Sequence, residues 1–486
     1  MFNRYTKSFA SIKAEAAEEG EKTLRRSLGA FNLVFLGIGV IIGAGLFSLT
    51  GIAAAENAGP AVSISFMLAA LACAFAGICY SEFSSIIPVA GSAYTYTYAT
   101  MGEFLAWVIG WDLVLEYALG AATVAVSWSR YLMEFLTKIG INLPPSLLAS
   151  PWETVTLSTG QQISGGIINL PAIFIVILTS LLLIKGTKES VTLNNVLVIL
   201  KLVVVLTFIV IGWGYMDPAN HIPYIPANTG AYENFGWTGI ATGAAVVFFA
   251  YIGFDAVSTA AQEAKNPQRD MPIGILGSLV ACTILYVLFS HVMTGLVHYT
   301  AFAGDAKPAA TAFAVTGYTF LQDAIILAIL AGYTSVIMVL LMGQSRVFYS
   351  MSKDGLLPKM FCAVHPKFRT PWKTNLFFMA FVSIFAGLVP VSDLGHMVSI
   401  GTLFAFVLVC IAVIVLRKTM PDLHRPFKTP LVPLIPLLGV GTCLYLMYSL
   451  PTESWIRLAI WMVLGIVIYF AYSRKHSHVR RQSEGK

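Results

Sequence analysis

The 486-residue sequence predicts an all-α polytopic membrane protein with twelve transmembrane helices. Of its residues, 57% are hydrophobic and only 11% are charged, whereas a soluble protein has about 25% charged residues. The hydrophobic residues also gather into long runs that short polar or Pro/Gly segments separate. A soluble domain could not cover so much apolar surface with so few charges, and a disordered or nucleic-acid-binding chain needs far more polar sequence.

Twelve apolar runs are long enough to cross a bilayer, which takes about 20 residues per helix. They lie near residues 31–54, 60–87, 103–136, 166–185, 191–213, 237–262, 273–297, 309–350, 373–390, 395–416, 430–449 and 455–473. The third and eighth runs are long enough to tilt or to hold an extra turn. A polar N-terminal segment, residues 1–30, precedes the first run, and a short tail, residues 474–486, follows the last one.

The basic residues predict the orientation of the chain. With the N-terminus inside, 25 of the 30 lysines and arginines fall in predicted cytoplasmic segments. The positive-inside rule therefore places both termini in the cytoplasm of a multi-pass cell-membrane protein, and an even number of spans agrees with that placement. The six cysteines are scattered and none forms a CxxC pair, so the sequence predicts neither a disulfide framework nor a metal site.

Two segments interrupt the helical pattern at membrane depth. Residues 37–47 contain four glycines, and residues 248–255 end in an acid, Asp255. Irregular backbone survives at that depth only where protein or a water-filled cavity satisfies it. Glycines in a single span more often allow close helix packing. Because the two breaks fall in spans 1 and 6, we favour a midplane site between two five-helix repeats, residues 31–213 and 237–416, followed by two additional helices within 430–473.

Such breaks would form a receptor for a zwitterion. Free amide N–H groups at Gly43, Ala44 and Gly45 begin a half-helix, where the helix dipole favours an anion. Free carbonyl groups on both sides of the breaks would accept hydrogen bonds from an ammonium group. The predicted carbonyl acceptors are those of Ile41, Phe249, Ala250 and Ile252. The sequence thus predicts that a carboxylate binds at the first break and an amine at the second.

Charged residues inside apolar spans are costly and are functional candidates by default. Lys201 lies ten residues from the nearest polar edge of its span, too deep to reach the interface easily. It is a candidate to gain and lose a proton, with a permanently charged ammonium held by backbone carbonyls as the alternative. Glu116 is a second candidate proton acceptor or a member of a packing network, and Asp255 is expected to orient the second break.

No residue pattern points to an enzyme. The sequence contains no phosphate-binding loop, no HExxH motif and no serine-nucleophile elbow. We therefore expect no catalytic residue and no cofactor.

At these segments the chain resembles the amino acid-polyamine-organocation transporter superfamily, and within it the cationic amino acid transporter family in its bacterial form. The matching segments run through nearly the whole chain, and the last two are the most specific to that family. They are residues 43–47 (GAGLF), 88–96 (PVAGSAYTY), 110–117 (GWDLVLEY), 193–205, 249–272, 346–355 (RVFYSMSKDG), 398–403 (VSIGTL) and 425–430 (RPFKTP).

The resemblance implies a LeuT-like fold with two inverted five-helix repeats, discontinuous helices 1 and 6, and two extra helices. It also implies import of α-amino acids by alternating access. In proton-coupled relatives a lysine in span 5 occupies the place that a sodium ion takes in sodium-coupled ones, and Lys201 matches that position. A proton is therefore the expected coupling ion. Sodium coupling, with Thr334 and Ser335 as hydroxyl ligands, and amino-acid exchange are the alternatives.

Span 8 carries Met338 among other bulky apolar residues, where a cationic substrate would need an acidic or strongly polar partner. This pattern favours broad or small neutral, alanine-like substrates and leaves cationic ones open. The expected partners are an amino-acid substrate and the lipid bilayer. The sequence leaves open the oligomeric state and whether a small single-span protein packs against the bundle.

Overall fold

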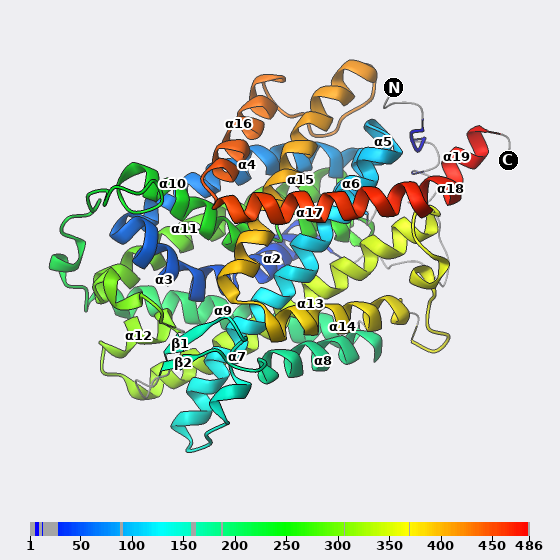
Figure 1. The fold of residues 1–486 in the computed structure, drawn as a ribbon. Helices are drawn as coiled ribbons and strands as arrows, with labels where there is room; N and C mark the ends of the chain where they lie inside the picture. The colour runs from blue at the N-terminus through cyan, green and yellow to red at the C-terminus, as the bar shows by residue number, and fades with distance from the viewer. Residues whose placement is uncertain are drawn as a thin grey trace.

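In the computed structural model, residues 5–8, 12, 28–87, 91–156, 162–185, 188–305, 307–368 and 370–484 are described. This part of the chain forms a bundle of closely packed helices (Figure 1). Eight of its helices are long and apolar enough to cross a membrane, and four shorter apolar helices accompany them. Most of the expected N-terminal segment, residues 1–30, lies outside the described residues.

The first half of the chain contains the first break and a short hairpin. Its main helices are α2 (Ala30–Ile41), η1 (Gly45–Leu49), α3 (Thr50–Ala53), η2 (Ala54–Ala58), α4 (Val62–Ile86), α5 (Ser92–Thr100), α6 (Glu103–Val114), η4 (Leu115–Leu119), α7 (Gly120–Lys138), α8 (Leu170–Lys185) and α9 (Lys188–Trp213). Strands β1 (Thr154–Thr156) and β2 (Gln162–Ser164) pair antiparallel, with Val155 opposite Ile163.

The second half contains the second break and the C-terminal helices. Its main helices are α10 (Gly236–Val247), η7 (Phe248–Tyr251), η8 (Asp255–Glu263), α11 (Pro267–Leu296), α12 (Pro308–Ala314), α13 (Thr319–Lys353), α14 (Trp372–Leu388), α15 (Val391–Thr419), α16 (Leu434–Tyr448), α17 (Thr452–Ile468), η11 (Tyr469–Ser473), α18 (Arg474–His476) and α19 (His478–Ser483).

Each of the twelve predicted apolar runs contains helix. The third is one continuous helical stretch through α6, η4 and α7. The eighth run, residues 309–350, contains two helices and not one continuous helix. The short α12 ends at Ala314, and α13 begins at Thr319. Gly317 has φ +75°, which a residue with a side chain rarely adopts, so the chain turns there. The tyrosines near residues 94–98 lie in the separate short helix α5, in which every residue is buried.

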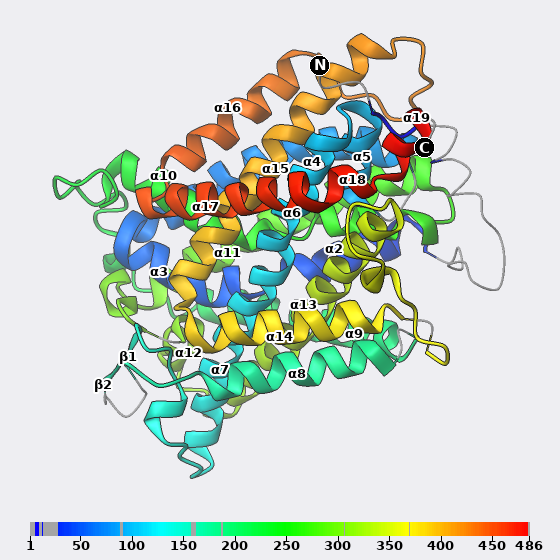
Figure 2. The same cartoon turned by 45° about the vertical axis from the view of Figure 1, so that its right-hand side comes forward.

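Both ends of the described chain lie at the same end of the bundle, where the Tyr5 hydroxyl donates to Glu484 at 3.2 Å, and we call it the terminal end (Figure 1). The β1–β2 hairpin and α12 lie at the opposite end, which we call the hairpin end (Figure 2). The placement of both termini at one end agrees with an even number of crossings.

A buried carboxylate fixes the loop between α15 and α16 at the terminal end. Glu82, near the end of α4, has no exposed surface. Its carboxylate accepts hydrogen bonds from Nε and Nη2 of Arg417, at 3.0 and 2.9 Å, and from the Thr429 backbone N–H at 2.8 Å. Arg425 adds an ion pair at 3.2 Å. The RPFKTP segment therefore folds around a buried charge.

Candidate functional site

The first break separates α2 from η1. Helix α2 ends at Ile41, and Ile42 is extended with φ −72° and ψ 103°. Helical bonding resumes when the Leu46 N–H donates to the Gly43 carbonyl at 3.2 Å. The amide N–H groups of Gly43, Ala44 and Gly45 stand at the start of this second half-helix, where no preceding turn can accept their hydrogen bonds.

The second break separates η7 from η8. Ile252 is extended with φ −59° and ψ 136°, and Gly253 follows with φ +107°. A Cβ atom at Gly253 would lie only 2.3 Å from a methyl carbon of Val40. Glycine is required here both by its backbone conformation and by this close approach to α2.

The two breaks contact each other directly. A Cβ atom at Gly45 would lie 2.2 Å from the Cα atom of Ala250, so only glycine allows this approach. The buried hydroxyl of Tyr286, on α11, lies 2.7 Å from the Ile41 carbonyl and 2.8 Å from the Ala250 carbonyl. With one proton it donates to one of them at a time and joins the two segments.

Three of the four predicted carbonyl acceptors already lie within hydrogen-bond distance of a donor in the protein. The carbonyls of Ile41 and Ala250 face the Tyr286 hydroxyl, and the Phe249 carbonyl accepts a hydrogen bond from the Ile252 N–H at 3.2 Å. Because a carbonyl oxygen has two lone pairs, each of these groups can still accept a further donor.

A small cavity lies where the breaks meet. It is lined by residues from both breaks and by apolar side chains of α7 and α13: Val40, Ile41, Gly43, Ala44, Gly45, Val124, Phe249, Ile252, Val336 and Leu340. At about 10 Å³ it has room for about one water molecule, so an amino acid would fit only after the walls move apart. Met338 is buried on α13, but it is not among the lining residues.

Lys201 contacts the first break from α9. Its side chain is buried, and Nζ donates to the Gly39 carbonyl at 2.6 Å. The lysine stem passes Gly332 on α13, where a Cβ atom would lie 2.9 Å from both Cγ and Cε. Among the ion pairs of the described residues, none involves Lys201.

Glu116 lies away from the cavity, in a second buried polar group. It is eight residues before the cavity residue Val124 on the same helical stretch, or about 12 Å along the axis. Its carboxyl group interacts electrostatically with that of Asp255, which accepts a hydrogen bond from the Tyr117 hydroxyl at 2.5 Å. In the described part of the chain, neither carboxylate oxygen of Glu116 has a hydrogen-bond partner. Glu116 and Asp255 thus form a buried acidic pair separate from Lys201.

Contacts between segments far apart in the sequence hold the bundle together at both ends. At the terminal end, Lys7 forms a 2.8 Å ion pair with Asp354, which also accepts a hydrogen bond from the Tyr94 hydroxyl at 2.7 Å. At the hairpin end, Pro308 packs against Gly51, and Lys307 forms an ion pair with Glu134.

The sequence prediction missed several residues of the site. Val124 and Leu340 lie in uninterrupted apolar helices, so nothing in their local sequence marks them as cavity walls, and Val336 stands out in the sequence only as one of the bulky apolar residues around Met338. Tyr286 carries a weak signal, because a hydroxyl group within an apolar run needs a hydrogen-bond partner.

The fold and this site indicate a class of protein: a multi-pass helical membrane transporter with a small cavity between two interrupted helices. The comparison with known families agrees, because a family model described as amino acid permease matches residues 28–471. The chain belongs to this family, within the amino acid-polyamine-organocation superfamily, and it resembles the cationic amino acid transporters. It is a transporter and not an enzyme.

Similar proteins cover nearly the whole chain. The branched-chain amino acid permease BcaP of Bacillus subtilis (strain 168) is 48% identical over 96% of this chain and 97% of its own length. The methylthioribose transporter of the same organism is 44% identical over 96% of this chain and 97% of its own length. Cationic amino acid transporter 9, chloroplastic, of Arabidopsis thaliana is 38% identical over 84% of this chain and 69% of its own.

Proposed function

We propose that the protein imports small to medium-sized neutral α-amino acids by alternating access. The observation that carries this proposal is the composition of the cavity, in which backbone N–H groups of the first break meet an apolar wall. None of its lining residues has an ionisable side chain. A substrate carboxylate would bind Gly43, Ala44 and Gly45, and an aliphatic side chain would contact Val124, Val336 and Leu340.

The substrate proposal also draws on the relatives. BcaP is named for branched-chain amino acids, whose side chains are aliphatic like the cavity wall. A cationic side chain would lie against apolar walls without a counter-charge, because Glu116 lies outside the lining. Methylthioribose has neither a carboxylate nor an amine for the two breaks.

A substrate screen tests this proposal. Purified protein in proteoliposomes should take up radiolabelled alanine, valine and leucine, and unlabelled neutral amino acids should compete. Arginine, lysine and methylthioribose should compete at least about tenfold less well, because their polar groups would remain unpaired in an apolar cavity. Uptake that only arginine and lysine inhibit, or only methylthioribose, would overturn the neutral amino acid assignment.

We further propose the transport architecture that the sequence predicts. In this arrangement all twelve apolar helices cross the membrane and the terminal end is cytoplasmic. The two five-helix repeats, 31–213 and 237–416, are inverted relative to each other, and each contributes one break. What supports it is the placement of the breaks in the first and sixth predicted spans, with both described termini at one end of the bundle. Substrate entry then requires Pro308 and Lys307 to move away from their partners at the hairpin end.

Proton coupling through Lys201 is the proposed driving mechanism. Its ammonium group donates to the Gly39 carbonyl beside the first break, so loss of its proton would replace a charge-assisted hydrogen bond by a weaker neutral one and loosen α2. The acidic pair Glu116–Asp255 is proposed as a second proton-handling group near the second break. A sodium ion near Thr334 and Ser335 is less favoured, because the Lys201 ammonium would repel a cation in the same region.

Lys201→Ala should abolish the dependence of alanine uptake on an inward proton gradient, while counterflow exchange with preloaded vesicles persists. The matched control is Lys185→Ala, which removes an exposed lysine at the end of α8 and should leave gradient-driven uptake unchanged. Wild-type uptake should not change when choline replaces sodium. A Lys201→Ala transporter that still responds to the proton gradient would exclude the role assigned to this lysine, and a wild type that only exchanges would favour the exchanger.

A further inference from the structure

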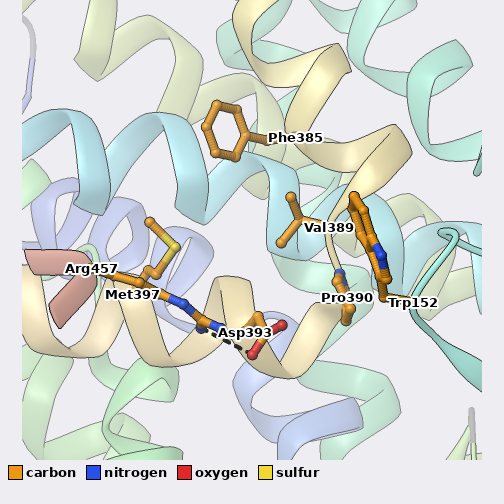
Figure 3. Close-up of a pocket in the computed structure, with 7 residues that line it drawn as sticks. All are labelled: Trp152, Phe385, Val389, Pro390, Asp393, Met397 and Arg457. Atoms are coloured by element: carbon orange, nitrogen blue, oxygen red, sulfur yellow. Dashed lines mark hydrogen bonds and ion pairs between the residues drawn. The ribbon is translucent and has the colours of Figure 1, made fainter. Parts of the chain in front are cut away.

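A second cavity lies at the hairpin end, away from the breaks. It occupies about 410 Å³ between the end of α14 and the beginnings of α15 and α17, within the size range of ligand pockets. Its lining residues are Trp152, Phe385, Val389, Pro390, Asp393, Met397 and Arg457 (Figure 3). None of these residues lines the cavity between the breaks.

The polar groups of this pocket form a single pair. Arg457 Nη1 donates to Asp393 Oδ1 at 2.9 Å, and their side chains are 33% and 37% exposed, respectively. The guanidinium group has five N–H donors and the carboxylate has two oxygens, so one shared hydrogen bond leaves capacity on both partners. The pair thus presents a positive and a negative group side by side, which complements a ligand that itself carries both charges.

The remaining wall residues are mainly apolar, and they lie at different distances from the hairpin end of the bundle. Figure 3 shows Trp152 beside Pro390, with Val389 next to them. Phe385 and Met397 lie one helical turn, about 6 Å, further from the helix ends than Val389 and Asp393. The pocket is therefore polar near the end of the bundle and apolar toward its middle.

The pocket adjoins the surface that faces lipid. Ile384, Ile456 and Ile460 flank it on α14 and α17 and are 59%, 54% and 58% exposed, as expected for side chains that the bilayer covers. Trp152 is 75% exposed, and an amphipathic indole is typical of the membrane–water interface. These exposures place the mouth of the pocket at the level of lipid head groups.

We infer that this pocket binds a phospholipid with a zwitterionic, primary-ammonium head group, of the phosphoethanolamine type. The lipid phosphate accepts hydrogen bonds from Arg457, the ammonium donates to Asp393, and an acyl chain lies against Phe385, Val389 and Met397. A purely anionic head group is disfavoured, because Asp393 balances Arg457 and Glu453 adds a second carboxylate one turn away on α17.

The test is lipid binding to the purified full-length protein in detergent, measured by native mass spectrometry. Dioleoylphosphatidylethanolamine should bind at least about tenfold more tightly than the phosphatidylglycerol with the same chains. Phosphatidylcholine, whose quaternary ammonium has no N–H donor, should bind more weakly as well. Arg457→Gln and Asp393→Asn should each weaken binding of phosphatidylethanolamine about tenfold, the loss expected for one charge-assisted hydrogen bond.

Lys138→Gln is the matched control. It removes another partly exposed basic residue from an ion pair at the same end, with Asp323, and should leave lipid binding unchanged. Free phosphoethanolamine at equal concentration should not displace the lipid, since it lacks the chain that contacts the apolar walls. Equal binding to the Arg457→Gln variant, equal binding of phosphatidylglycerol, or displacement by free phosphoethanolamine would each overturn the proposal. Alanine uptake by Arg457→Gln shows that the variant is folded.

Discussion

Gly45→Ala is expected to abolish substrate transport. The new Cβ atom would lie 2.2 Å from the Cα and 2.5 Å from the backbone N of Ala250, whereas carbon atoms in contact are about 3.5–4.0 Å apart. Because the clash is with backbone, no side-chain rotation relieves it, and the two breaks must separate by more than about 1 Å. Uptake of alanine into proteoliposomes and the thermal shift that alanine produces should both be lost.

Gly343→Ala is the control for this change. Gly343 is also a buried glycine, on α13, but a Cβ atom there would lie 3.8 Å from the ring of Tyr117, an ordinary contact distance. Transport by this variant should be close to wild type. Combining Gly45→Ala with Ala250→Gly should not restore transport, because the Cα and N atoms of residue 250 remain. A restored double variant would mean that the contact is only between side chains.

Glu82→Gln is expected to lower the free energy of unfolding by about 3–5 kcal/mol, the usual cost of removing one partner of a buried ion pair. The variant would leave Arg425, whose side chain is only 3% exposed, without the carboxylate that faces it. The amide keeps only one neutral acceptor oxygen, so Arg417 and the Thr429 N–H could no longer both bond as they do to the carboxylate. The expected result is a lower melting temperature of the purified protein and release of the loop between α15 and α16.

Asp422→Asn separates this effect from a general loss of negative charge. Asp422 lies on the same loop but is exposed, so its replacement should change the melting temperature little. Hydrogen exchange should accelerate at Thr429 in Glu82→Gln and not in Asp422→Asn. Equal stability of the two variants would show that the buried carboxylate does not fix the loop.

The sequence predicted the two breaks well because their cause is local. Four glycines within residues 37–47 and the Gly253 position leave a visible mark, since glycine weakens a helix, although Gly37 and Gly39 themselves lie in α2. The lysine at residue 201 was equally visible as a charge within an apolar run, and the structure places it against Gly39, next to the first break. What these groups bind and which ion they couple to stay predictions.

The walls of the cavity were less predictable. Val124 and Val336 are two of many valines in long apolar helices, and only the crossing of α7 and α13 at the breaks distinguishes them. Met338 was chosen because it lies on the correct span, but two residues along a helix rotate a side chain by about 200°, so Val336 and Leu340 line the cavity and Met338 is not among the lining residues. Glu116 also lies outside the cavity lining, and its carboxyl group interacts with that of Asp255 instead.

By itself, the sequence determined that this is a helical membrane protein with two interrupted helices, because hydrophobicity and glycine content act through local backbone physics. Only the tertiary structure decided that Gly45 and Ala250 touch, that Tyr286 joins the breaks, and that Lys7 pairs with Asp354. Gly45 and Ala250 are 205 positions apart in the chain, and Tyr286 is 245 positions from Ile41. Contacts of that kind depend on how whole helices pack, which no local pattern encodes.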